Sequence, residues 1–447
     1  MSGCGLRGQE WNTCMARAPK ECTVRTSNAC AALSPFPRSI NTTMRSLLKC
    51  CLLLILPAVA QTQVAPTQSA APGPITIGTV DSIWSPTLKE YRRYQVYTPP
   101  AYRQSVYLPR AYPVMYLLDG DAHFHSVTGL LQILGTGVNG TYVVPEMIVI
   151  AIPNTNRTRD LTPTHSVNGS NGTPGIANSS GGMSNFLQFM KTELIPHIDS
   201  TFRTEPFRLF VGHSLGGITT INALYTMPET FNAYVAIDPS LWWDGQFLLK
   251  KARDYFGKPV TPSRTLFVGQ ANTINAADTT PNFHFGSIVQ FNSILESSTT
   301  SGIRYGYKYY GGDDHGSVPL IAEYDALRFI FADYKSDLLK SLEQPAFITE
   351  HFARVSAKLG YRVLPPEKMV DQFGQIALSR DTTKAVALMR LNAELYPRSS
   401  HAFVALGNTL VAKHDTTGAR TAYGRSLELD PGNQRARDML AKLTSGQ

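Results

Sequence analysis

Phe207-Arg-Leu-Phe-Val-Gly-His-Ser-Leu-Gly-Gly217 is the stretch that decides the fold. Residues 207–211 predict a short buried strand, and the apolar run 218–227 predicts a helix. Between them, residues 212–216 fit G-x-S-x-G. A glycine-flanked serine between a strand and a helix is the context that a nucleophile elbow requires. The glycines are needed because a Cβ at either flank would collide with backbone in so tight a turn.

This turn predicts both a nucleophile and part of its oxyanion hole. The hydroxyl of Ser214 would stand clear of the sheet. The amide of Leu215, at the start of the helix, would point to the place where an oxyanion forms. The structural alternative is a glycine-rich turn with an incidental serine.

The N-terminal region has the three parts of a secretory signal peptide. From Met44 a basic start is followed by an apolar run that is too short to span a bilayer and by the A-x-A site Ala58-Val-Ala60. We expect a signal peptide over 44–60, a mis-called extension over 1–43 and a disordered linker over 61–74. The mature chain would be secreted or periplasmic and would have no membrane span.

Removal of this region changes the cysteine count and the charge. All six cysteines lie in the first 51 residues, so the mature chain would have no disulfide. Residues 1–43 carry five Lys/Arg and two Asp/Glu, and residues 44–60 carry two Lys/Arg, so the net charge falls from +8 to +3. With no basic run elsewhere, the sequence does not favour a nucleic-acid partner.

Residues 75–340 alternate short apolar runs with helical patterns, which indicates an α/β fold. Two edge strands are expected to be antiparallel, and the remaining strands are buried and parallel. The result is a mostly parallel twisted sheet flanked by helices, in the strand order of an α/β-hydrolase, with Ser214 after the fifth strand. The expected strands cover 75–83, 91–97, 113–118, 146–152, 207–211, 233–237, 264–268 and 305–310, and the expected helices include 183–202, 285–296 and 318–331.

The loop Asp119-Gly-Asp-Ala-His-Phe-His125 follows the third expected strand. In this fold it donates the second oxyanion amide, which we assign to the backbone of Asp121. A rival interpretation takes Asp119, Asp121, His123 and His125 as metal ligands, because alternate residues of an extended segment share a face. That spacing matches no recognised metal motif, so we expect no metal and no cofactor.

The general base is expected at His315, in Gly311-Gly-Asp-Asp-His-Gly-Ser317 after the last strand. His284 is a weaker rival, and His213 is too close to the serine along the chain. The acid of a triad is harder to place, because the loop after the seventh strand, Gly269-Gln-Ala-Asn272, offers only amides. We choose Asp278, with Asp238 as the alternative, and a Ser–His dyad without a carboxylate also fits.

The loop 152–160 follows the fourth strand and lies where ligands bind in such folds. Arg159, with Arg157 and Asp160, either positions a polar substrate or holds the loop by ion pairs.

The body of the chain, roughly 75–335, resembles the esterase branch of the α/β-hydrolases, which includes esterase D, feruloyl esterases and trilactone siderophore esterases. Five motifs in order carry the resemblance: 112–120, 152–160, 212–217, Pro239-Ser-Leu-Trp-Trp243 and Asp314-His-Gly-Ser317. It implies hydrolysis of a small-molecule carboxylic ester with Ser214 and His315 as catalytic residues. The relatives often have an acid where this chain has Asn272. Trp242 and Trp243 would line the pocket or pack in the core.

Residues 366–447 contain a repeat of 34 residues. Asp381-Thr-Thr-Lys-Ala385 recurs as Asp415-Thr-Thr-Gly-Ala419, and Glu394-Leu-Tyr-Pro397 recurs as Glu428-Leu-Asp-Pro431. The period and the small residues resemble the tetratricopeptide repeat, which predicts a small all-α module of paired helices. Two repeats are too few for independent stability, so the module should pack on the hydrolase domain or on a second copy of the chain. Its groove either binds a peptide or only caps the hydrolase.

Three functions fit these patterns. The leading one is a secreted serine carboxylesterase that works through an acyl-enzyme on Ser214. An acyltransferase of the same fold would replace water with an alcohol. A repeat scaffold that carries an inactive hydrolase is the third, and the intact elbow argues against it.

Overall fold

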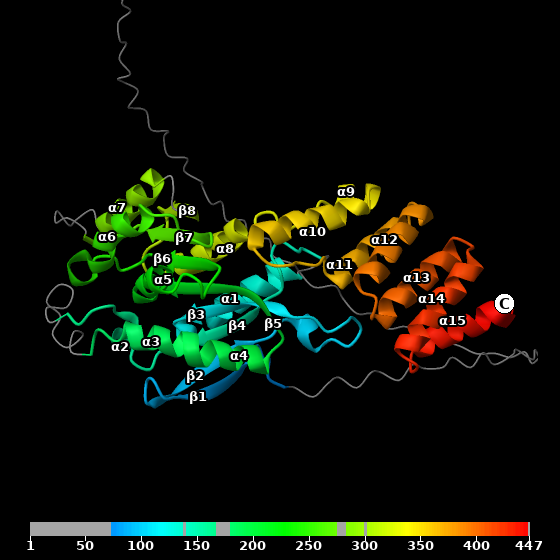
Figure 1. Cartoon of the computed structure of the whole chain (residues 1–447), viewed down its shortest axis with the longest axis horizontal. Helices are drawn as coiled ribbons and strands as arrows, with labels where there is room; N and C mark the ends of the chain where they lie inside the picture. The colour runs from blue at the N-terminus through cyan, green and yellow to red at the C-terminus, as the bar shows by residue number, and fades with distance from the viewer. Residues whose placement is uncertain (1–72, 137–139, 167–178, 275–282, 299–301, 446–447) are drawn as a thin grey trace, which may run out of the picture. The chain divides into compact units, whose positions relative to one another are not determined.

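The computed structural model describes residues 73–136, 140–166, 179–274, 283–298 and 302–445 (Figure 1). The predicted signal peptide over 44–60, the extension before it and nearly all of the linker lie outside these residues, as does Asp278. Within the described part of the chain, no helix is long and apolar enough to cross a membrane.

The centre of the structure is an eight-stranded sheet in the order β1-β2-β4-β3-β5-β6-β7-β8. β2 is antiparallel to β1 and β4, and the pairs from β4 through β3 and β5 to β8 are parallel. The predicted mostly parallel α/β fold is therefore confirmed. The strands are β1 (Thr79–Ser85), β2 (Glu90–Tyr97), β3 (Tyr112–Leu118), β4 (Ile148–Ile152), β5 (Thr204–His213), β6 (Ala233–Ile237), β7 (Arg264–Ala271) and β8 (Ile303–Tyr310).

The strand predictions differ from the structure mainly at the ends. The first strand begins at Thr79 rather than at residue 75, because its register is set by pairing Thr79–Ser85 with Glu90–Val96 of β2. Strands β3, β4 and β6 are buried along their whole length, as their continuous apolar runs predict for strands covered on both faces.

Helices cover both faces of the sheet, and each face has its own hydrophobic cluster. One cluster joins the sheet to α3, α4, α5, α6 and α7, and the other joins it to α1, α8 and the helices that follow. The predicted helix 183–202 is present as α3, a π-helical turn at Met190–Leu194, and α4. The bounds are α1 (Gly120–Gly135), α2 (Arg157–Leu161), α3 (Met183–Phe189), α4 (Ile195–Thr201), α5 (Leu215–Thr226), α6 (Trp243–Phe256), α7 (Phe283–Ser297) and α8 (Val318–Ile330).

The C-terminal part of the chain is all helical, as predicted. Figure 1 shows these helices in yellow to red, with α11 to α15 following one another side by side. They are α9 (Leu338–Glu343), α10 (Ala346–Leu359), α11 (Glu367–Leu378), α12 (Thr382–Leu395), α13 (Ser400–Ala412), α14 (Thr416–Leu429) and α15 (Gln434–Ser445).

The 34-residue period appears as two helix pairs, α11 with α12 and α13 with α14. The second helix of each pair begins after an aspartate whose side chain caps it: Asp381 accepts from Thr383 N, and Asp415 accepts from Gly418 N. Glycines let the helices of a pair approach closely. A Cβ on Gly407 would lie 2.6 Å from the ring of Tyr423.

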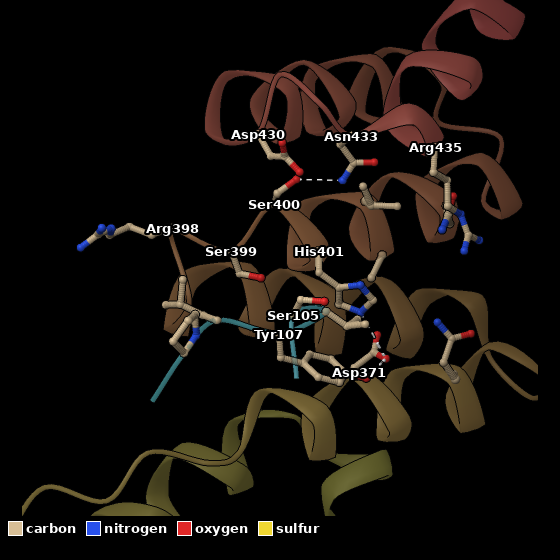
Figure 2. A pocket seen from close by; sticks show the side chains of 17 residues that line it. Ser105, Tyr107, Asp371, Arg398, Ser399, Ser400, His401, Asp430, Asn433 and Arg435 are labelled. Carbon is tan, nitrogen blue, oxygen red and sulfur yellow. Dashed lines mark hydrogen bonds and ion pairs between the residues drawn. The ribbon is translucent and has the colours of Figure 1, made fainter. Parts of the chain in front are cut away.

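The helical repeats pack on the sheet domain through a polar contact and an apolar one. Tyr107 Oη donates to Asp371 Oδ2 at 3.2 Å, its ring lies 4.8 Å from that of His401, and Leu108 N donates to Glu367 Oε2 at 3.0 Å. Ser105 and Tyr107 line a cleft of about 700 Å³ together with residues of the repeats. Figure 2 shows their side chains beside Asp371 and His401. Buried residues of α10, α11 and α12 also belong to the hydrophobic cluster on one sheet face.

Replacement of Gly407 by alanine should lower the melting temperature. The new Cβ meets the Tyr423 ring, which is fully buried and donates its hydroxyl to Asn408 Oδ1 at 2.9 Å, so the ring cannot move freely. We expect overpacking to cost about 1–3 kcal/mol, more than the gain of up to ~1 kcal/mol in helix propensity.

Gly424→Ala on α14 is the matched control. A Cβ there meets nothing within 4 Å, so only the propensity gain applies and the melting temperature should rise. Thermal unfolding followed by circular dichroism compares the two variants. Equal shifts of the same sign would contradict the close helix contact.

Candidate active site

The residues of the candidate site follow strands β3, β5, β6 and β8, and β7 separates β6 from β8 in the sheet. Asp119 comes after β3, Ser214 after β5, Asp238 after β6, and His315 in the loop that follows β8. Since the carboxyl ends of parallel strands meet at one edge, the topology brings these residues together.

The elbow has the strained geometry that the sequence predicts. Ser214 has φ 58° and ψ −114°, a conformation that costs a non-glycine residue about 1–3 kcal/mol. A Cβ on Gly212 would lie 2.2 Å from the carbonyl oxygen of Gly216. Ser214 N donates to Ile237 O at 2.9 Å, and Ser240 N donates to Ser214 O at 3.1 Å. The β6 end therefore supports the turn directly.

Asp238 binds two histidines with one oxygen. His315 Nδ1 donates to Asp238 Oδ2 at 2.5 Å, and His284 Nε2 donates to the same oxygen at 2.8 Å. Ala271 N donates to Asp238 Oδ1 at 2.9 Å. The carboxylate is fully buried, whereas the His315 side chain is 43% exposed. With its proton on Nδ1, His315 presents a bare Nε2 that can accept a proton.

Burial alone would raise the pKa of Asp238, but the hydrogen bonds from His284 and His315 outweigh it and hold the pKa well below its usual range. Asp238 is therefore ionised at neutral pH. An ionised carboxylate fixes the tautomer and the orientation of the imidazole that it binds.

His315 lies beside the elbow. Its ring centroid is 4.5 Å from that of His213, the residue before Ser214. In this structure Ser214 Oγ contacts Ser240 Oγ at 3.1 Å. A serine–histidine hydrogen bond often forms only when substrate is bound, so this geometry is compatible with proton transfer between Ser214 and His315.

Asn272 follows β7, at the place where the sequence resemblance implies an acid. Its backbone N donates to Asp313 O at 2.8 Å, and its side-chain amide donates to Gly311 O at 3.1 Å. Asn272 therefore holds the backbone of the loop that carries His315.

The two residues predicted to form the oxyanion hole lie at helix starts. Leu215 begins α5, and Asp121 is the second residue of α1, so the amides of both belong to first turns, which lack intrahelical partners. A Cβ on Gly216 would lie 3.2 Å from Asp119 Oδ2, which places the two helix starts next to each other.

The structure corrects the predicted loop over 119–125. The helix α1 begins at Gly120, directly after Asp119, which adopts the left-handed conformation with φ 53°. The rival metal interpretation required an extended segment, so its premise is wrong. Among the described residues, the side chains that converge closely enough to hold a metal ion are instead Asp238, His284 and His315.

Arg157 clamps the two helix starts together. Its Nε and Nη2 donate to the two carboxylate oxygens of Asp119 at 2.7 and 3.0 Å, and Nη2 also donates to His213 O at 3.1 Å. Asn154 adds bonds from its Nδ2 to Asp119 Oδ1 at 2.8 Å and to Asp121 Oδ1 at 3.0 Å. The segment after β3 and the elbow are thus held in a fixed relation.

A buried glutamic acid lies behind the site. Burial raises the pKa of Glu323 to about 8, and burial lowers the pKa of His123. The two groups approach to 3.8 Å, but these shifts leave both neutral near pH 7, so their contact is not an ion pair. Burial and the neighbouring His315 and His123 also lower the pKa of His213 to about 3.

The remaining predicted site residues have the following positions. Arg159 pairs with Glu90 and with Asp160, which agrees with the ion-pair alternative for its loop. Trp243 is 3% exposed in the core and donates from its indole N–H to Thr164 Oγ1 at 3.2 Å, whereas Trp242 is half-buried. Asp278 lies outside the described residues.

Three residues near the site were not predicted from the sequence to take part in it. Asn154 lies two residues after the end of β4 and Ser240 three residues after the end of β6, both at the carboxyl edge of the sheet, and that position was the available signal. Glu323 sits on an amphipathic helix, where a glutamate normally faces water, so nothing local indicated its burial.

The fold and the site together define the class: this strand order, with an elbow serine after β5 and a histidine after β8, is that of an α/β-hydrolase. The family model described as "Putative esterase" matches residues 85–267. The ferri-bacillibactin esterase BesA of Bacillus subtilis (strain 168) is 31% identical over 259 residues, which cover 54% of this chain and 85% of that protein.

Two further similarities agree with this class. The siderophore enterobactin esterase of Emericella nidulans is 32% identical over 157 residues, covering 32% of this chain and 50% of that protein. The crystal structure of an IroE-like serine hydrolase from Shewanella oneidensis is 31% identical with a TM-score of 0.62, and the match covers 71% of this chain and 99% of that chain. The chain belongs to the putative esterase family and is a carboxylic-ester hydrolase.

Arg157→Lys should lower kcat roughly ten- to hundredfold with little change in KM. A lysine cannot bridge both oxygens of Asp119 and the carbonyl of His213, so the two helix starts lose their alignment. Arg203→Lys is the control, because Arg203 donates to the carbonyls of Arg110 and Tyr102, away from the strand ends that carry the site. A change in KM alone would show that Arg157 binds substrate rather than aligning the site.

Glu323→Gln should change how stability depends on pH. The folded protein keeps the Glu323 proton between about pH 4.5 and 8, where the unfolded chain has lost it. Stability of the wild type therefore falls with rising pH through this window, by about 1.4 kcal/mol per pH unit, and glutamine removes that slope.

Urea unfolding at several pH values from 5 to 8 measures this effect, with the exposed Glu350→Gln as the control. The stability of Glu323→Gln relative to the wild type should rise with pH. A constant difference across the series would show that Glu323 is ionised in the folded protein.

Proposed function

We propose that the protein hydrolyses esters through an acyl-enzyme on Ser214. The observation that carries this proposal is the contact of His315 Nδ1 with the buried, ionised Asp238, beside the strained elbow. This contact orients His315 as a base, and membership of the esterase family indicates that the reaction is ester hydrolysis.

In the proposed mechanism, His315 Nε2 accepts the Ser214 proton as Oγ attacks the ester carbonyl. The backbone amides of Asp121 and Leu215 donate to the oxyanion of the tetrahedral intermediate. His315 then returns the proton to the leaving alcohol, and the acyl-enzyme forms. Water deprotonated by His315 attacks the acyl carbonyl, Ser214 leaves with the proton, and the free acid departs. In the acyltransferase alternative, a second alcohol takes the place of this water.

We assign the acid of the triad to Asp238. It is bound to His315 Nδ1, which is the role that the acid must fill. The sequence predicts Asp278 instead, because the acid is expected in the loop after the seventh strand. The side-chain amide of Asn272 binds the backbone carbonyl of Gly311 in the loop that carries His315. The residue after β7 therefore holds this loop and need not be a carboxylate.

We propose siderophore esters as the natural substrate class. The support is that two relatives act on siderophores, the ferri-bacillibactin esterase and the siderophore enterobactin esterase. We also propose that the mature protein starts after the signal sequence 44–60 and is secreted or periplasmic, on the sequence pattern alone.

We propose that the helical repeats of 366–447 cap the esterase domain of 75–340. The support is that Tyr107 and Leu108 of the esterase domain already bind Asp371 and Glu367 on the repeats. A free peptide would have to share this surface with a segment of the same chain.

Hydrolysis of p-nitrophenyl esters, from acetate to octanoate, tests the proposed mechanism. Ser214→Ala should reduce activity to background. Asp238→Asn should lower kcat by roughly 10³- to 10⁴-fold, as loss of the acid does in serine proteases, because the imidazole takes the wrong tautomer. Asp278→Asn should cost far less, and a trilactone siderophore assayed in parallel tests the substrate class.

Asp254→Asn on the exposed face of α6 controls for the loss of a carboxylate. If Asp278→Asn lowered kcat more than Asp238→Asn, the acid would be assigned to Asp278. If Ser214→Ala retained activity, the acyl-enzyme would be excluded. Release of a transferred ester instead of the free acid, in the presence of added alcohol, would favour the acyltransferase alternative.

A further inference from the structure

The triad carboxylate has one more imidazole than the proposed mechanism needs. His315 alone supplies the base, yet His284 binds the same oxygen, Asp238 Oδ2, at 2.8 Å. The ring centroids of His284 and His315 lie 5.1 Å apart and their planes are perpendicular. The other nitrogen of His284, Nδ1, is buried and has no hydrogen-bond partner in the described structure.

We propose that Asp238, His284 and His315 form a latent site for a divalent ion of the Zn²⁺ class, and that occupation of this site switches the esterase off. The inference rests on the proposed role of His315 as the base. One atom from each residue, Asp238 Oδ2, His284 Nε2 and His315 Nδ1, would bind the ion, and these atoms lie within 4.8 Å of one another.

The donor set selects the class of ion. Two imidazole nitrogens and one carboxylate oxygen suit Zn²⁺ and related transition metals, whereas Mg²⁺ and Ca²⁺ prefer oxygen ligands alone. Ligand atoms around a tetrahedral zinc ion lie roughly 3.3 Å apart, so the two nitrogens must move from Asp238 Oδ2 by about 0.5–0.8 Å. His315 can make such a shift, because its side chain is 43% exposed and lies in a loop that contains Gly312 and Gly316. Solvent water would complete the coordination from the exposed side.

Metal binding would disable the base through its tautomer. His315 now carries its proton on Nδ1, where Asp238 accepts it. When Nδ1 binds the ion, that proton moves through solvent to Nε2, and the neutral ring then has no lone pair for the Ser214 proton. His284 undergoes the corresponding change, with its proton passing from Nε2 to Nδ1. Two protons are relocated and none is lost, so inhibition is reversed when the ion is removed.

The alternative is that His284 only donates a second hydrogen bond to Asp238. His284→Gln separates the two roles, because an amide can still donate to a carboxylate but is a poor ligand for zinc. His125→Gln is the matched control: His125 lies exposed on α1, within the segment of the discarded metal interpretation.

The experiment measures p-nitrophenyl acetate hydrolysis by the metal-stripped full protein as ZnCl₂ is added, with MgCl₂ in parallel and Ser214→Ala as the blank. We expect Zn²⁺ to suppress activity, EDTA to restore it, and Mg²⁺ to have no effect. His284→Gln should require roughly tenfold more Zn²⁺ for half-inhibition, or more, whereas His125→Gln should match the wild type. If His284→Gln fails to fold, His284→Asn takes its place.

A second readout does not depend on activity. Zn²⁺ should raise the melting temperature of the wild type and not that of His284→Gln, because only a folded site binds the ion. Activity that Zn²⁺ leaves unchanged or increases would overturn the proposal, as would equal inhibition of wild type and His284→Gln. A protein without esterase activity would refute the proposed function, and the melting series would still decide whether the metal site exists.

Discussion

The ionised carboxylate of Asp238 is the constraint on which the site depends. A fully buried charge is unfavourable unless it is paired and hydrogen-bonded. The buried carboxylate of Asp238 is stabilised by hydrogen-bond donors from three different elements. Ala271 N comes from β7, His284 from α7, and His315 from the loop after β8. One of the bonds that stabilise the buried charge is therefore the bond that orients His315, the proposed base.

The backbone around Asp238 reinforces this arrangement. Asp238 has φ 41°, a strained value for a residue with a side chain, and its amide donates to Gly269 O at 2.7 Å. The elbow serine next to it is also strained. Both residues end buried parallel strands, β5 and β6, whose pairing runs to His213 and Ile237. The rigid sheet thus holds two unfavourable conformations side by side and directs both side chains to the same edge.

Much of the fold and part of the site could be predicted from the sequence. Continuous apolar runs mark buried strands, and the glycines around Ser214 mark a turn that excludes a Cβ, so local patterns sufficed there. The partners of His315 depend on which strands lie next to each other. Asp238 and His315 are 77 residues apart, and no local pattern reports that contact. The burial of Glu323 and the bonds from Arg157 to Asp119 also depend on contacts between segments that are distant in the sequence.

In the proposed site, the residues that follow the adjacent strands β6 and β7 have different roles. Neighbouring strands are only about 4.8 Å apart, so a carboxylate after β6 or after β7 can reach the same imidazole. In this chain the residue after β7 is Asn272, and its amide groups donate to the carbonyls of Gly311 and Asp313. An aspartate side chain at 272 would face the Gly311 carbonyl without a proton to donate. Asn272 is thus suited to hold the loop, and Asp238 to bind the ring that the loop carries.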